Sequence, residues 1–189
     1  LVLIASENNI KDPFDPRVVE AYWLGNKLLA NVKARPFAAH LTDGLNLKHK
    51  LETKKITPMI DHFVTSGVPQ HNFHVLNIFI RTGHLPVPHT LSTMDQCRVS
   101  WGKIKKKVIG SSFIVQTQSL VYVNGKLQLG MKEDKTVFSI AVEPNIGDWV
   151  SIHWGYVCDI LTPQQRLNLM YYTQKALVAA NNSQIGLSS

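Results

Sequence analysis

The sequence has few of the residues and runs that place a chain in a specialised class of protein. Only two cysteines, Cys97 and Cys158, occur in 189 residues, too few for a disulfide framework. Residues 1–5 are apolar, but this run is far shorter than a membrane span and has no basic residue before it, so it is not a signal peptide. These absences predict a cytoplasmic protein with free thiols and no membrane partner. The chain does not begin with Met, which is consistent with a missing N-terminal portion.

Acidic residues are also scarce. The chain has 13 Asp and Glu against 20 Lys and Arg, which gives a formal net charge of +7. Part of the excess lies in two clusters of lysine: Lys48, Lys50, Lys54 and Lys55, and then Lys103, Lys105, Lys106 and Lys107. Such a surface favours an acidic partner, including nucleic acid. A solvated face is the plainer interpretation of both clusters.

Helix signals dominate the first half of the chain. Asp15 followed by Pro16 predicts an N-cap with proline at the first helical position. Thr57 and Pro58 repeat this signal and predict a second helix. Residues 74–80 form an apolar run that periodicity assigns to neither helix nor strand.

The prolines between residues 83 and 89 interrupt any helix, because proline lacks a backbone donor and restricts the residue before it. A domain boundary is therefore predicted between about residues 83 and 94. The expected domains are a mainly helical domain over residues 1–92 and a second domain over residues 93–189.

Short β-segments punctuated by turns fill much of the second half. Asn124-Gly125 lies between two strand-like runs and predicts a two-residue hairpin turn. Strands are expected over residues 98–104, 113–123, 126–129, 136–142 and 149–154. Five or so short strands suit a small closed barrel of the OB-like kind. Thr162 and Pro163 then begin a capping-box pattern that predicts a C-terminal helix, so the expected fold class is α+β.

Two runs in this half share the motifs of a known family. Residues 97–104 read Cys-Arg-Val-Ser-Trp-Gly-Lys-Ile, and residues 146–157 read Ile-Gly-Asp-Trp-Val-Ser-Ile-His-Trp-Gly-Tyr-Val before the predicted helix. They resemble the HypC/HupF-type maturation chaperones of nickel–iron hydrogenases. Chains of that family open with Cys, three residues and Pro-Gly-Lys-Val, and end with Val-Gly-Asp-Tyr-Val-x-Val-His-x-Gly-Phe-Ala and a helix. Here Trp101 stands in place of the proline. The resemblance covers about residues 95–180.

The resemblance implies a carrier and chaperone, not a catalyst in its own right. By analogy, Cys97 and His153 would hold an iron that carries cyanide and carbonyl ligands and is bound transiently. The implied partners are a HypD-type scaffold protein and the hydrogenase large-subunit precursor. Gly102, Lys103, Trp154 and Gly155 are then the expected contacts with partner or cargo.

The chemistry of these residues is compatible with that role. A soft thiolate suits a low-valent iron, and imidazole can complete the site. The lysines that follow Cys97 are expected to lower the pKa of its thiol or to hold an anionic cargo. The glycines would let the backbone approach a bulky group closely. On their own, however, a buried inert thiol and a core histidine are the plainer interpretations of Cys97 and His153.

Two alternatives remain open. One is an OB-type nucleic-acid-binding module that uses the lysine clusters. The other is a metal-dependent enzyme that uses His71 and His74, whose spacing places two imidazoles on one face of a helix, with His84 and His89 nearby. The histidine spacing matches no zinc signature, no carboxylate completes the set, and no nucleophile or acid–base pair accompanies it. A polar network is the plainer interpretation of these histidines.

Overall fold

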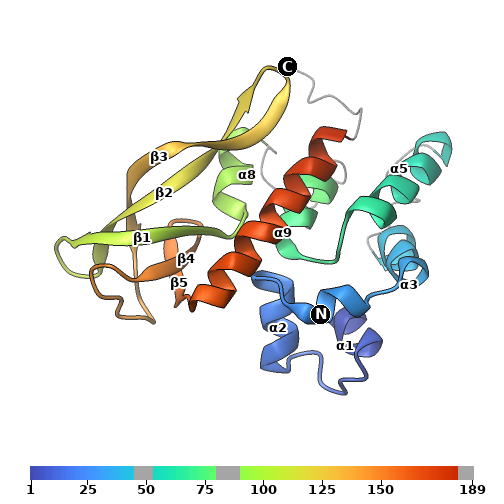
Figure 1. Ribbon diagram of the computed structural model, residues 1–189, viewed down its shortest axis with the longest axis horizontal. Coiled ribbons are helices and arrows are strands. Elements are labelled where there is room, and N and C mark those ends of the chain that lie inside the picture. The colour runs from blue at the N-terminus through green and yellow to red at the C-terminus, as the bar shows by residue number, and fades with distance from the viewer. Residues whose placement is uncertain (45–52, 80–89, 183–189) are drawn as a thin grey trace. The chain divides into compact units, whose positions relative to one another are not determined.

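The computed structural model describes residues 1–44, 53–79 and 90–182 (Figure 1). The protein is α+β, as predicted, with helices in the first half and a five-stranded sheet with a closing helix in the second. The chain divides into two compact units. Leu1–Pro86 and Tyr171–Ser189 form one, here the helical unit, and Val87–Met170 form the other, here the barrel unit.

Short helices make up the described part of the helical unit. They are α1 (Val2–Glu7), α2 (Pro16–Trp23), the 3-10 helix η1 (Lys27–Asn31), α3 (Ala34–Ala39), the π-helix η2 (His40–Gly44), α5 (Thr53–Ser66), α6 (His71–Phe73), the π-helix η3 (His74–Phe79) and the last part of α9 (Pro163–Asn182). The apolar run from residue 74 is thus helical up to Phe79. The predicted cap of α2 is confirmed, because the Asp15 side chain accepts a hydrogen bond from the backbone N–H of Arg17.

Two features of the helical unit differ from the prediction. α5 begins at Thr53, one turn before the predicted start, so Pro58 lies inside the helix. The tail of α9 also belongs to this unit, whereas residues 93–189 were expected to form one domain. Buried polar side chains account for this division. Asn72 Nδ2 donates to Thr173 Oγ1 at 2.8 Å, and Asn77 Nδ2 donates to the carbonyl of Ala176 at 3.0 Å.

The barrel unit contains α8 (Leu91–Cys97) and five described strands. These are β1 (Ser100–Lys107), β2 (Ser112–Val123), β3 (Lys126–Phe138), β4 (Trp149–His153) and β5 (Tyr156–Ile160). The strands close in the order β1-β2-β3-β5-β4. β4 pairs antiparallel with β1, and Phe138 of β3 pairs parallel with Tyr156 of β5. β2 and β3 run side by side as a long hairpin (Figure 1).

Alternate residues of the strands fill the interior of the barrel. The buried cluster consists of Ile104, Phe113, Val115, Val137, Val150, Ile152 and Val157. Gly102 lies within this packing, because a Cβ at Gly102 would lie 2.3 Å from Val115 Cγ2 and 3.2 Å from Ile152 Cδ1. The absence of a side chain at Gly102 therefore lets β1 approach β2 and β4 closely.

Local turn and cap predictions hold in this unit, whereas several strand limits do not. Asn124 and Gly125 have φ of 52° and 76°, as a type I′ hairpin turn requires. Thr162 and Gln165 form the predicted capping box before α9. β3 is one continuous strand where two short ones were expected, and β5 was not predicted. Cys97 was expected beside the first strand, but it ends a helix.

Candidate functional site

Cys97 is the last residue of α8, a helix that a capping box begins. The backbone N–H of Thr93 donates to Thr90 Oγ1, and the N–H of Thr90 donates to Thr93 Oγ1. α8 ends after Cys97 because the next residue adopts extended backbone, with φ −65° and ψ 145°. Only 4% of Cys97 is exposed. The fold therefore holds the thiol at a fixed, buried position at the end of a helix.

Burial raises the pKa of the Cys97 thiol, and a hydrogen bond with the Trp154 side chain opposes this only in part. The expected lowering by the lysines after Cys97 is therefore wrong. Lys103, Lys105, Lys106 and Lys107 are all exposed on β1. The thiol is protonated at neutral pH, so it must lose a proton when it binds a metal.

His153 is the last residue of β4 and is half-buried. One of its ring nitrogens lies within 4.8 Å of Cys97 Sγ. Burial lowers the pKa of His153, although a hydrogen bond with the backbone of Cys97 raises it in part. The imidazole is consequently neutral at pH 7, which is the form that binds metals. The barrel unit thus brings together the two residues that the sequence motifs single out.

A tight turn positions His153 beside α8. Trp154 and Gly155 join β4 to β5 with φ of 50° and 78°, so this is a second turn in which both central residues are left-handed. The backbone N–H of Trp154 donates to the carbonyl of Gln96 at 2.9 Å. A Cβ at Gly155 would meet no atom within 4 Å, so its glycine serves the turn geometry. Trp154, Gly155 and Lys103 are at least partly exposed, whereas Gly102 is buried in the barrel.

A buried ion pair next to this site was not predicted. Arg98 Nε and Nη2 donate to Asp95 Oδ1 at 3.0 and 2.8 Å, and the Arg98 side chain is only 2% exposed. The pair lies where the register between β2 and β3 shifts. There the N–H of Leu120 donates to Asp95 Oδ1, and the carbonyl of Gln118 accepts from Arg98 Nη2 at 2.6 Å. The pair therefore satisfies backbone groups that the strand pairing leaves over.

Asp95 also faces a second cation. Lys135 Nζ lies 3.1 Å from Asp95 Oδ2. Burial alone would raise the pKa of Asp95, but the charge of Arg98, the Leu120 N–H and the hydrogen bonds from Lys135 and Arg98 together lower it. The spacing of three residues between Asp95 and Arg98 is compatible with an ion pair at the end of a helix. The sequence alone does not show that a helix ends there.

A cavity of about 90 Å³ opens beside the ion pair in the barrel unit. Its charged lining residues are Asp95, Arg98 and Lys135, and Trp154 contributes to its wall. Val137 and Ile152 add apolar surface. We call this space the Arg98 cavity. Since Trp154 neighbours His153 in the chain, the cavity adjoins the turn that positions the Cys97–His153 pair.

His71 and His74, the other predicted metal-binding candidates, are both buried in the helical unit. The His71 ring lies 4.4 Å from the ring of Trp23, and its Nδ1 is 3.5 Å from the Tyr22 hydroxyl. The His74 ring lies 5.8 Å from the ring of Tyr22. Aromatic packing therefore surrounds both imidazoles.

Cys158, Asp148 and several basic residues remain to be placed. Cys158 is exposed on β5, and its thiol forms a hydrogen bond with the backbone of His153. Asp148 Oδ2 accepts a hydrogen bond from the N–H of Asn145 at 2.8 Å, so its side chain stabilises the turn before β4. His84 and His89 lie outside the described residues, as do Lys48 and Lys50 of the first lysine cluster. Across the residues that the structure describes, no helix has the length and apolar character needed to cross a membrane.

Comparison with known proteins identifies a family but no function. No curated protein and no solved structure matches the sequence. Residues 1–186 match the model of a family described as "Family of unknown function (DUF6390)". This match spans the residues of both compact units. The chain therefore belongs to the DUF6390 family.

Proposed function

We propose that this protein is an accessory factor in the maturation of nickel–iron hydrogenases. It binds an iron–cyanide/carbonyl cargo, or the large-subunit precursor that receives it, through Cys97 and His153. The observation that carries the proposal is the separation of the two side chains, whose ligand atoms lie within 4.8 Å of each other. Metal bonds of about 2.0–2.3 Å from nitrogen and sulfur allow two ligands of one ion to lie up to roughly 4.5 Å apart.

The strand order supports the same proposal. β4, β1, β2 and β3 are neighbours in that order around the closed sheet, which is the spatial order of a Greek key. A five-stranded Greek-key barrel is the OB-like architecture that the resemblance implies. On this proposal, the protein acts in the cytoplasm and meets a HypD-type scaffold protein as well as the precursor.

The chemistry divides between the two residues. Cys97 supplies the soft ligand after it loses its proton, and the neutral His153 ring supplies a second ligand. Two protein ligands leave positions on the iron for its small ligands. Burial of Cys97 limits access of water and oxidants to the thiol.

Infrared spectroscopy tests the cargo directly. The protein is coexpressed with the hydrogenase maturation proteins, purified without oxygen and examined for cyanide and carbonyl stretches. We expect bands in the wild type and in the matched control Cys158→Ala, and no bands in Cys97→Ala or His153→Ala. Capture of the tagged large-subunit precursor, measured in the same variants, tests the second form of the proposal. Absence of bands and of capture in the wild type would overturn both forms.

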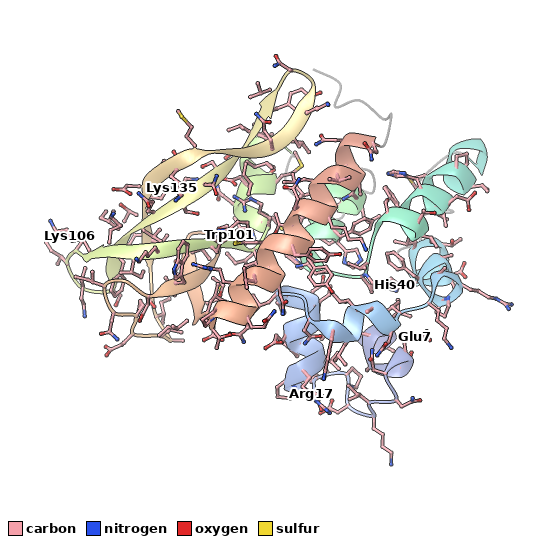
Figure 2. The ribbon with its side chains drawn as sticks, viewed as in Figure 1. Glu7, Arg17, His40, Trp101, Lys106 and Lys135 are labelled. Atoms are coloured by element: carbon pink, nitrogen blue, oxygen red, sulfur yellow. The ribbon has the colours of Figure 1, made fainter. Side chains whose placement is uncertain are left out.

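A second candidate function is binding of single-stranded nucleic acid, favoured by the four exposed lysines on β1. Figure 2 shows Lys106 towards the end of β1, well away from Lys135 on β3. A fluorescence-anisotropy titration with single strands at several salt concentrations separates this candidate from the first. If the protein binds nucleic acid, its affinity for single strands should fall steeply with salt. Lys105→Gln and Lys106→Gln should weaken this affinity, whereas Cys97→Ala should leave it unchanged.

A further inference from the structure

We propose that the Arg98 cavity is a binding site for a small carboxylate, either a free one or the C-terminal carboxylate of a peptide. The cavity lies in the barrel unit and has a volume of about 90 Å³. This inference does not depend on the proposed role in hydrogenase maturation.

The charge of the lining favours a monoanion. Two cations, Arg98 and Lys135, and one anion, Asp95, line the cavity, which leaves one positive charge in excess. Arginine does not lose its proton in proteins, so this excess persists at neutral pH. Glu133 lies 3.6 Å from Lys135 Nζ but does not line the cavity. One carboxylate neutralises the excess, whereas a doubly charged phosphate would leave the lining negative overall.

The guanidinium has a donor available for such a ligand. Arg98 Nε donates to Asp95, and Nη2 donates both to Asp95 and to the Gln118 carbonyl. Nη1 donates to no acceptor among the residues that the structure describes, although the side chain is 98% buried and lines the cavity. Nη1 is not among the fully buried polar atoms that lack a partner, so it keeps some exposure where Arg98 lines the cavity. A carboxylate oxygen placed there would accept a charge-assisted hydrogen bond from it.

The rest of the lining suits a short aliphatic group. Val137, Ile152 and Trp154 provide apolar surface, and Ser100 and Thr117 provide hydroxyls. An apolar cavity of roughly 150 Å³ holds a benzene molecule. The smaller Arg98 cavity therefore fits a carboxylate with only a few carbon atoms, or the last residue of a peptide.

Lys135 offers the best variant for a test, because its side chain is 40% exposed and its replacement is tolerated more readily than that of Arg98. Lys132→Gln makes the same change of charge on the same strand, at an exposed position outside the cavity. The intact chain is titrated at low ionic strength with acetate, acetamide and inorganic phosphate. The chemical shifts of the Arg98 Nε–H and the Trp154 indole N–H report occupancy. N-acetylalanine and its amide then separate a peptide end from a free carboxylate.

We expect saturable shifts with acetate and none with acetamide. Lys135→Gln should lower the affinity for acetate about tenfold, because a charged hydrogen bond is lost. Lys132→Gln should change this affinity less than about twofold. Arg98→Lys, if it folds, should abolish binding. Tighter binding of N-acetylalanine than of acetate identifies a peptide end as the better source, and the reverse identifies a free carboxylate. Equal shifts with acetate and acetamide, tighter binding of phosphate, or equal effects of the two lysine variants would overturn the proposal.

Discussion

The backbone N–H of Trp154 donates to the carbonyl of Gln96 at 2.9 Å. This bond joins the turn after β4 to the last turn of α8. The two sequence motifs are distant in the chain. The hydrogen bond connects the residue before Cys97 in one motif to the residue after His153 in the other. Trp154 adopts a left-handed φ of 50°, which costs an L-residue roughly 1–2 kcal/mol. The β4–β5 hairpin therefore holds Trp154 in an unfavourable backbone conformation next to the candidate site.

The two cysteines should differ in reactivity towards a maleimide. Cys158 is exposed and Cys97 is 4% exposed, so Cys158 should react first and Cys97 only when the structure opens locally. An opening free energy of about 3 kcal/mol would slow Cys97 roughly a hundredfold. Mass spectrometry of the native protein should show one rapid addition, which Cys158→Ser removes. Rapid labelling of Cys158→Ser without denaturant would contradict the buried position of Cys97.

Gly102→Ala should destabilise the barrel, because the added Cβ would lie 2.3 Å from Val115 Cγ2. Overpacking of this kind costs about 1–3 kcal/mol in the free energy of unfolding. Val115→Ala alone should also destabilise through the cavity that it leaves. The double variant Gly102→Ala/Val115→Ala should be more stable than the sum of the two single losses predicts. The smaller side chain at residue 115 removes the overlap with the Cβ added at residue 102, and that Cβ fills part of the cavity left at residue 115. Strictly additive values from urea unfolding would contradict close packing between Gly102 and Val115.

Asp95→Ala should cost about 3–5 kcal/mol, because it leaves the buried Arg98 charge without its carboxylate. Arg98→Met in the same chain should recover part of this loss by removing the charge. Asp134→Ala, which removes an exposed carboxylate from β3, is the matched control and should change stability by less than about 0.5 kcal/mol. Unfolding midpoints in urea measure all three. Equal losses of stability from Asp95→Ala and Asp134→Ala would contradict a structural role for the Asp95–Arg98 pair.

The cap of α2 should make stability depend on pH in acid. Hydrogen bonds from the side chain and backbone of Arg17 lower the pKa of Asp15 to about 2. Its folded pKa lies below the unfolded value of about 3.9, so this contribution is complete above the unfolded pKa and disappears as the pH falls through about 2. Asp15→Asn keeps a good capping residue but does not titrate. The stability difference between wild type and Asp15→Asn should therefore shrink between about pH 5 and pH 2. Parallel stability curves across this range would contradict the prediction.

Features fixed by neighbouring residues could be predicted from the sequence. The Asn124-Gly125 turn, the Asp15 cap and the Thr162 capping box each depend on a few adjacent side chains and backbone groups. The α+β class also follows from local patterns of apolar residues. The pairing of Cys97 with His153 was suggested by a resemblance, and their proximity within the barrel unit agrees with it.

Other features depend on partners that are distant in the sequence. β5 has only one buried residue, Val157, so it carries no alternating pattern, and its pairing with β4 defines it as a strand. The polar middle of β3 resembles a turn in the sequence, but pairing with β2 keeps it extended. The large apolar residues of α9 do not mark its buried face, because Leu167, Met170 and Tyr171 are exposed. Small residues such as Ala176 and Ala179 face inward instead.

The sequence by itself determined the class of the fold, its local turns and caps, and the two residues on which a metal-binding proposal rests. These properties follow from short-range hydrogen bonding and from the periodicity of apolar side chains. Only the tertiary structure decided that Cys97 ends a helix, that burial raises the pKa of its thiol, and that Arg98 lies with Asp95 beside a cavity. Burial and desolvation depend on which distant strands pack around a residue, and no local pattern of residues specifies them.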